Sequence, residues 1–104
     1  MSERTLGTVA TRLLMENDRV RVWEMDLAPG ARSDTHQHEL DYVLVQIEGD
    51  RIAAQPELDT KGAYREYIEG DVVPGKTRYI VRGGIETAIN IGARRYREIL
   101  IELK

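Results

Sequence analysis

The chain of 104 residues contains no cysteine and no phenylalanine, and it has only two histidines and one tryptophan. Without cysteine there is no disulfide, no thiolate nucleophile and no metal site with sulfur ligands. Any bound metal must therefore be held by nitrogen and oxygen atoms. Because phenylalanine is missing, Trp23 and five tyrosines are the only aromatic side chains of the Phe, Trp and Tyr type, and we expect them mainly in packing roles.

Long apolar runs and an excess of basic charge are also missing. No apolar stretch approaches the roughly 20 residues that cross a bilayer, and the first residues lack the apolar core and cleavage site of a signal peptide. The net charge is −3, without the basic footprint that nucleic-acid binding needs. The short cluster Arg94, Arg95 and Arg97 is predicted to be a solvated strand end rather than an anion site. We predict a cytoplasmic protein without a membrane or nucleic-acid partner.

Short segments of strand character, separated by Gly, Pro and turn residues, fill the chain. We predict strands at 8–14, 19–27, 42–48, 51–55, 63–68, 77–81, 87–90 and 95–103, and turns at 28–30, 49–50, 70–71 and 74–75. About eight to ten such segments, without helical periodicity, indicate an all-β sandwich or barrel. The length fits one domain, 1–104, with 1–7 as a candidate N-terminal arm. In the last segment Ile99, Ile101 and Leu103 share one wholly apolar face.

Both histidines lie two residues apart, between two segments that read as strands. Side chains at positions i and i+2 of a strand point to the same face, so His36 and His38 are placed to contact one ion. Imidazole suits iron, nickel, manganese, zinc and copper. The nearby acids Asp34, Glu39 and Asp41 are candidate oxygen ligands. Two histidines alone are too few, because three or four protein ligands are usual.

The spacing of these residues resembles the first motif of the cupin superfamily. Gly30 is followed after five residues by His36-Gln37-His38, then after three by Tyr42 and after six by Gly49. A weaker similarity to the second motif runs from Gly70-Asp71 through Arg82-Gly83-Gly84 to Thr87 and Asn90. The resemblance covers residues 19–103. It implies a small single-domain antiparallel jelly-roll β-barrel with a central metal, held by two histidines, a glutamate and a third histidine.

The chain departs from this pattern at two of the four implied ligands. Tyr42 stands where the resemblance implies glutamate, and we place Thr87 where it implies the third histidine. Arg82 also replaces the usual proline, and Asn90 then sits one residue early. Glu86, next to Thr87, is a candidate substitute acid, although surface exposure is the simpler interpretation. The sequence is thus identified as a small cupin with a degenerate metal site.

Three interpretations of this site remain open. In the first, His36 and His38 bind a divalent transition metal, and Tyr42, Asp41 or Glu86 with water fill the other positions. In the second, the barrel has lost its metal and keeps a polar pocket of His36, His38 and Tyr42. In the third, both histidines are structural and bond turn carbonyls at the barrel mouth.

For function, the first interpretation predicts a metal-dependent enzyme acting on a small polar organic molecule inside the barrel. The resemblance implies oxygenation, isomerisation or decarboxylation, and Tyr42 is the candidate proton donor. The alternative is a non-catalytic binding module for a small acid or sugar, or a protein kept for its assembly alone. A homodimer is expected, because a small barrel whose terminal strand has an apolar face has an edge to cover.

Overall fold

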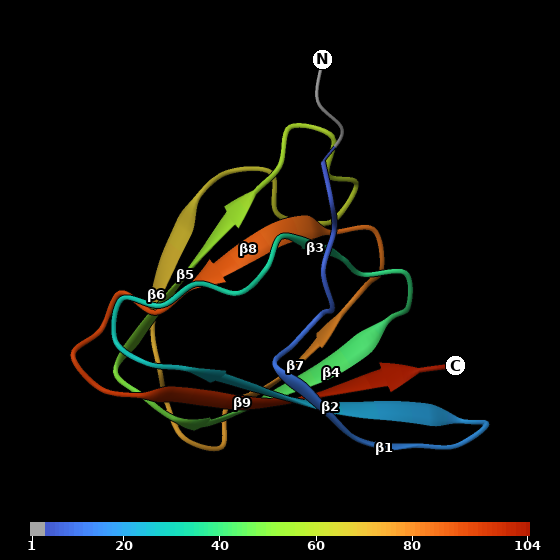
Figure 1. Ribbon diagram of the computed structural model, residues 1–104, viewed down its shortest axis with the longest axis horizontal. Helices are drawn as coiled ribbons and strands as arrows, with labels where there is room; N and C mark the ends of the chain where they lie inside the picture. Colours follow the sequence, from blue (N-terminus) through green and yellow to red (C-terminus); the bar gives the residue numbers. More distant parts are fainter. Residues whose placement is uncertain (1–3) are drawn as a thin grey trace.

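The computed structural model describes residues 4–104, which form nine β-strands and, within that range, no helix. The strands are β1 (Arg12–Glu16), β2 (Val20–Leu27), β3 (His36–Gln37), β4 (Tyr42–Glu48), β5 (Arg51–Pro56), β6 (Ile68–Asp71), β7 (Thr77–Ile80), β8 (Ile85–Ile89) and β9 (Tyr96–Leu103). They form a five-stranded sheet, β1-β2-β9-β4-β7, and a four-stranded sheet, β3-β8-β5-β6, which face each other as two layers (Figure 1). All pairings are antiparallel, which confirms the predicted all-β antiparallel class.

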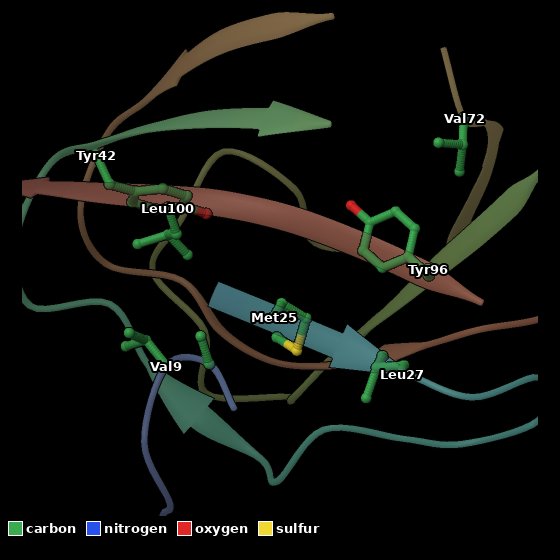
Figure 2. Packing of buried hydrophobic residues seen from close by; sticks show 8 residues of the cluster. Val9, Met25, Leu27, Tyr42, Val72, Tyr96 and Leu100 are labelled. Carbon is green, nitrogen blue, oxygen red and sulfur yellow. The ribbon is translucent and has the colours of Figure 1, made fainter. Parts of the chain in front are cut away.

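Strands β2 and β9 form the centre of the larger sheet. They pair over their whole length, from Val20 opposite Leu103 to Leu27 opposite Tyr96. Alternate side chains of β9 are buried and half-buried, as expected for a strand with one face on the core. Met25 and Leu27 of β2 and Tyr96 and Leu100 of β9 belong to the buried apolar cluster between the layers (Figure 2).

The apolar face predicted for the last segment exists, but it faces away from the other sheet. Ile99 and Ile101 are half-buried on the outer side of β9, whereas Glu98 and Glu102 are buried on its inner side. The strand is also not an edge, because β9 lies between β2 and β4. The edges of this sheet are β1 and β7, so the edge argument for a dimer does not apply to β9.

Two predicted strand positions were wrong. The first strand is Arg12–Glu16 rather than 8–14, and Val9 and Ala10 instead are buried ahead of it as part of the core. The segment 63–68 is loop except for its last residue, and Gly70-Asp71, predicted as a turn, continues β6. Its bounds follow from the partner strand, since Ile68 pairs with Ala54 and Asp71 with Arg51.

Part of the candidate arm 1–7 can be placed against the barrel. Arg4 forms ion pairs with Asp59 at 2.8 Å and Glu57 at 3.2 Å, and the amide of Gly7 donates to the carbonyl of Thr35 at 2.8 Å. Residues 1–3 lie outside the described part of the chain. Within 4–104, no helix is long and apolar enough to cross a membrane.

Candidate functional site

His36 lies in β3, the edge strand of the smaller sheet, and His38 directly follows that strand. Both are almost completely buried, with 2% of His36 and 3% of His38 exposed. Their ring centroids are 4.9 Å apart and the ring planes are nearly perpendicular. The spacing of two residues therefore brings the imidazoles together, as predicted.

The backbone around His38 is fixed by a close approach of two loops. The amide of His38 donates to the carbonyl of Gly84, and the amide of Gly83 donates to the carbonyl of His38, both at 2.8 Å. Gly83 has a φ of +111°, and a Cβ atom there would lie 2.9 Å from the carbonyl oxygen of Lys61. Only glycine fits this conformation and contact without strain, so the glycine pair positions the histidine strand.

Both histidines line a cavity of about 290 Å³ between the two sheets. Its apolar wall includes Val9, Met25, Leu44, Ile52, Ile80, Ala88 and Leu100. Its polar and charged lining includes His36, His38, Tyr42, Gln46, Lys76, Arg78, Glu86, Tyr96 and Glu98. A mainly apolar wall with a few convergent polar groups is typical of a small-molecule site.

The hydrogen bond of His36 fixes which of its ring nitrogens carries the proton. Its Nδ1 lies 2.7 Å from the carbonyl oxygen of Asp34. A carbonyl only accepts, so Nδ1 carries the proton and Nε2 is left as the lone-pair nitrogen. Burial lowers the pKa of His36 from its ordinary value, which favours this neutral form.

His38 is buried without a hydrogen bond on one of its ring nitrogens. Its Nδ1 is the one fully buried side-chain nitrogen or oxygen without a partner among residues 4–104. Burial, and after it the charge of His36, lowers the pKa of His38 to about 3. His38 is therefore a neutral imidazole at neutral pH, able to bind a ligand through a lone pair.

Tyr42, at the start of β4, packs against the second histidine. Its ring stacks on that of His38, with centroids 4.1 Å apart and an angle of 18° between the planes. Burial raises the pKa of the Tyr42 phenol, and nearby Glu86 and Glu98 raise it further. The phenol therefore keeps its proton, so Tyr42 is suited to donate a hydrogen bond rather than to act as a phenolate ligand.

The residue at the third-histidine position is Glu86, which corrects the placement at Thr87. His36 and Glu86 are directly paired between β3 and β8, so their side chains share the face that lines the cavity. Thr87 points to the opposite face, where its hydroxyl lies 2.7 Å from that of Thr35. When Thr87 is assigned to the third-histidine position, Asn90 lies one residue too early; when Glu86 is assigned to it, Asn90 lies at the spacing that the motif implies. The position of Asn90 was thus the sequence signal that could have identified Glu86.

Four acids line the cavity, Glu69, Asp71, Glu86 and Glu98, and of these Glu86 and Glu98 are at least half-buried. Glu86 is half-buried in the cavity lining rather than surface-exposed, and burial raises its pKa. Glu98 was not singled out from sequence. It is 5% exposed, accepts a hydrogen bond of 2.5 Å from the Tyr96 hydroxyl, and has a pKa raised by burial to about 7. Its inward position follows from the alternation of β9.

The other acids near the histidines do not converge on them. Asp34 and Glu39 are exposed. Asp41 accepts hydrogen bonds from the Tyr79 hydroxyl at 2.8 Å and the Arg82 amide at 2.9 Å. Among residues 4–104, no three His, Cys, Asp or Glu side chains form a group that could hold a metal. His36 and His38 thus lie side by side without a third such ligand beside them in the described chain, so a metal held there would need water or the bound molecule to complete its ligands.

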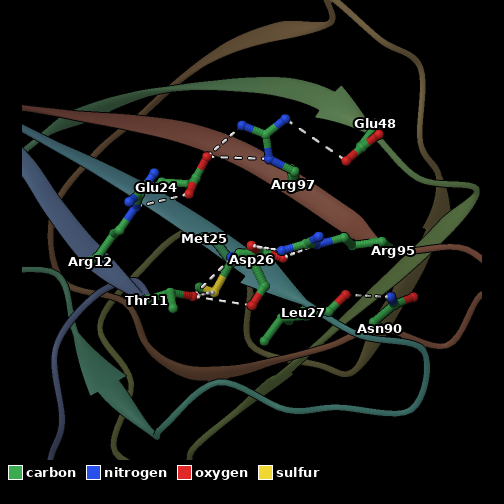
Figure 3. A network of polar contacts seen from close by, with 10 residues as sticks. All are labelled: Thr11, Arg12, Glu24, Met25, Asp26, Leu27, Glu48, Asn90, Arg95 and Arg97. Carbon is green, nitrogen blue, oxygen red and sulfur yellow. Dashed lines mark hydrogen bonds and ion pairs between the residues drawn. The ribbon is translucent and has the colours of Figure 1, made fainter.

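Two arginines of the basic cluster near the C-terminus are paired with acids of β2. Arg95 donates through Nε to Asp26 at 2.6 Å, and Arg97 donates to Glu24 at 2.5 Å (Figure 3). Arg12 binds the other oxygen of Glu24 at 3.1 Å. Arg95 and Arg97 are thus paired across the outer face of β2 and β9, whereas Arg94 is exposed.

Solved structures show the same fold across the whole chain. No family model matches the sequence, and no curated protein matches it. A cupin domain from Bordetella pertussis Tohama I superposes with a TM-score of 0.78 at 22% identity, covering 100% of this chain and 99% of that one. A cupin superfamily protein from Desulfitobacterium hafniense DCB-2 gives a TM-score of 0.63 at 18% identity, covering 98% and 83%.

A third structure, a sugar phosphate isomerase of the cupin superfamily from Silicibacter pomeroyi DSS-3, gives a TM-score of 0.58 at 18% identity. It covers 84% of this chain and 52% of that one. At such low sequence identities, these superpositions establish the fold but not the activity. Together with the two facing antiparallel sheets and the central cavity, they confirm the predicted cupin-type jelly roll. The chain has the fold of a small cupin domain.

Proposed function

We propose that the chain binds a small polar organic molecule in the cavity between its sheets, and that His36 and His38 hold a divalent transition metal beside that molecule. The observation that carries the proposal is that both neutral imidazoles line one cavity of about 290 Å³. Iron, nickel, manganese, zinc and copper all suit such nitrogen donors. When bound, the metal would act as a Lewis acid toward an oxygen of the molecule.

The residues around the histidines support this role. The Asp34 carbonyl accepts the Nδ1 proton of His36 and so leaves Nε2 for a ligand, as carbonyls bonded to the other ring nitrogen do for metal-bound histidines. Glu86 on β8 is paired directly with His36 on β3, so its carboxyl lies on the same face of the sheet as the His36 ring. Tyr42 is proposed to donate its hydroxyl proton to the bound molecule, because burial keeps that proton in place.

The reaction class stays within the range that the cupin resemblance implies: oxygenation, isomerisation or decarboxylation. The similarity in fold to a sugar phosphate isomerase supports a catalytic use of such a cavity, but 18% identity transfers no substrate.

A metal-free binding module is the second candidate function. The observation that favours it is the missing third ligand: in the described chain only His36 and His38 converge, and Glu86 does not form a three-residue metal group with them. In this case the two imidazoles, Tyr42 and Glu86 would hold the molecule by hydrogen bonds alone.

Metal analysis of protein purified without a histidine tag separates the two candidates. We expect close to one equivalent of a transition metal, before or after reconstitution, and its loss in the His36→Ala/His38→Ala variant. Thr87→Ala, which changes the opposite face of β8, is the matched control and should keep the metal. Less than about a tenth of an equivalent, unchanged on reconstitution, would refute the metal and leave the binding module, since three or four ligands are usual for tight sites.

We further propose a cytoplasmic homodimer. The half-buried outer face of the larger sheet, with Val22, Val43, Ile99 and Ile101, presents apolar side chains to solvent, and such faces are commonly covered by a symmetric copy.

A further inference from the structure

We propose that the molecule bound in the cavity is an organic anion, and that Arg78 recognises its carboxylate or phosphate group. This inference rests on the proposed function of the cavity and adds the chemical class of its ligand. It begins from two cations, Lys76 and Arg78, that line the cavity where β7 begins.

Neither cation has an acid partner within the described chain. The arginines at 4, 12, 21, 51, 82, 95 and 97 each form an ion pair with an Asp or Glu side chain. No such pair within 4.0 Å involves Lys76 or Arg78 in residues 4–104. A half-buried guanidinium without an ion-pair partner keeps its N–H donors for a ligand.

The guanidinium of Arg78 is held in place by an aromatic ring. Its Cζ atom lies 5.2 Å from the ring centroid of Tyr64, which belongs to the loop between β5 and β6 and also lines the cavity. Such a cation–π contact attracts the guanidinium to the ring without using its N–H groups. Those groups remain available, and the planar fork of Arg78 matches a carboxylate or phosphate.

The acids in the cavity lining form no ion pair within 4.0 Å with these cations in the described chain. Asp71 and Glu69 are paired with Arg51, at 2.5 Å and 3.4 Å. Glu86 and Glu98 also line the cavity, and Arg78 lies close enough for its charge to lower the pKa of Glu86, against the raising effect of burial. Arg78 therefore keeps its N–H donors at the cavity wall, where a bound anion would meet them.

The cavity volume limits the anion to a small molecule. At about 30 Å³ of liquid per water molecule, 290 Å³ corresponds to roughly ten waters. The apolar wall of Met25, Leu44 and Leu100 suits a short carbon skeleton, so we infer a small organic acid or a small phosphate ester rather than a neutral sugar.

Matched pairs of acids and amides test this inference by ligand-observed NMR titration: glycolate with glycolamide, lactate with lactamide, and benzoate with benzamide, plus glycerol phosphate with glycerol. We expect at least one anion to bind roughly tenfold tighter than its neutral partner, as for a charge-assisted hydrogen bond. Arg78→Gln should abolish this preference. Arg94→Gln, which removes an exposed charge outside the cavity lining, should leave it unchanged.

The outcomes separate the inference from the proposed function. If the neutral partners bind as well as the anions, or if the preference survives Arg78→Gln, the anion inference is wrong while cavity binding stands. A preference that survives Arg78→Gln but disappears after treatment with EDTA would assign the selection to a metal instead. If no probe binds, acid or neutral, both the inference and the proposed cavity function are contradicted.

Discussion

Replacing Glu98 with glutamine should stabilise the fold at alkaline pH much more than at acidic pH. Glu98 is buried on β9, with the Tyr96 hydroxyl as its hydrogen-bond donor at 2.5 Å, and burial raises its pKa from 4.5 to about 7. In the unfolded chain the carboxyl titrates near its ordinary value. Between pH 4.5 and about pH 7, the Glu98 carboxyl has lost its proton in the unfolded chain but still holds it in the folded protein. The stability of the folded protein therefore falls as pH rises through this range.

The size of the effect follows from the shift. A difference between 4.5 and about 7, at about 1.36 kcal/mol per pKa unit, gives about 3 kcal/mol. Below pH 4.5 this contribution to stability is fully present, and above pH 7 it is lost. Glutamine cannot ionise and keeps an acceptor for the Tyr96 hydroxyl, so Glu98→Gln should gain up to about 3 kcal/mol over the wild type between pH 4.5 and pH 8.

Chemical denaturation at a series of pH values measures this difference directly. The matched control is Glu66→Gln, which removes an exposed carboxyl from the loop before β6 and should follow the wild-type profile. If the difference in free energy of unfolding between Glu98→Gln and the wild type is the same at pH 5 and pH 8, Glu98 is not held as a neutral acid and the reasoning is refuted.

Three other predictions follow from particular contacts. Trp23→Phe removes the indole N–H that donates to buried Glu102 at 2.6 Å. Because a buried carboxylate loses a hydrogen-bond partner, the free energy of unfolding should fall by about 1–3 kcal/mol. Chemical denaturation measures this, and an unchanged midpoint would contradict it. Gly83→Ala should lower the free energy of unfolding by about 1–3 kcal/mol, because Gly83 has a positive φ and the added Cβ would meet the Lys61 carbonyl. In the control Gly70→Ala, no atom lies within 4 Å of the added Cβ, so the loss should be much smaller. Light scattering at micromolar concentration should give a dimer that Ile101→Glu dissociates, and a wild-type monomer would remove the homodimer proposal.

Much of the fold was predictable because strand periodicity and turn chemistry agree along most of the chain. The strand predicted at 42–48 has the same bounds as β4. Its run of β-branched residues is closed by Gly49, which has a φ of +136°. The turn at 28–30 was predicted from Pro29 and Gly30, and Gly30 has a φ of +81°. β6 was misplaced because its bounds depend on pairing with β5, a contact between segments distant in sequence.

The candidate site was predictable where it depends on local spacing. His36 and His38 share a face because strands have a period of two, and the structure brings their rings together. Glu86 was named only as a substitute acid, and the third-histidine position was assigned to Thr87. A shift of one residue moves a side chain to the opposite face of a strand, and only the pairing of β3 with β8 fixes that register. Glu98 was missed because the sequence does not reveal which face of β9 is buried.

The anomalous scattering of a crystal of the untagged protein, measured at the absorption edges of the candidate metals, tests the central claim most directly. The account predicts one anomalous peak about 2.0–2.1 Å from a ring nitrogen of both His36 and His38, at the edge of a single element. Ordered water or an organic molecule between the two rings, without an anomalous signal in protein reconstituted with metal, would contradict it.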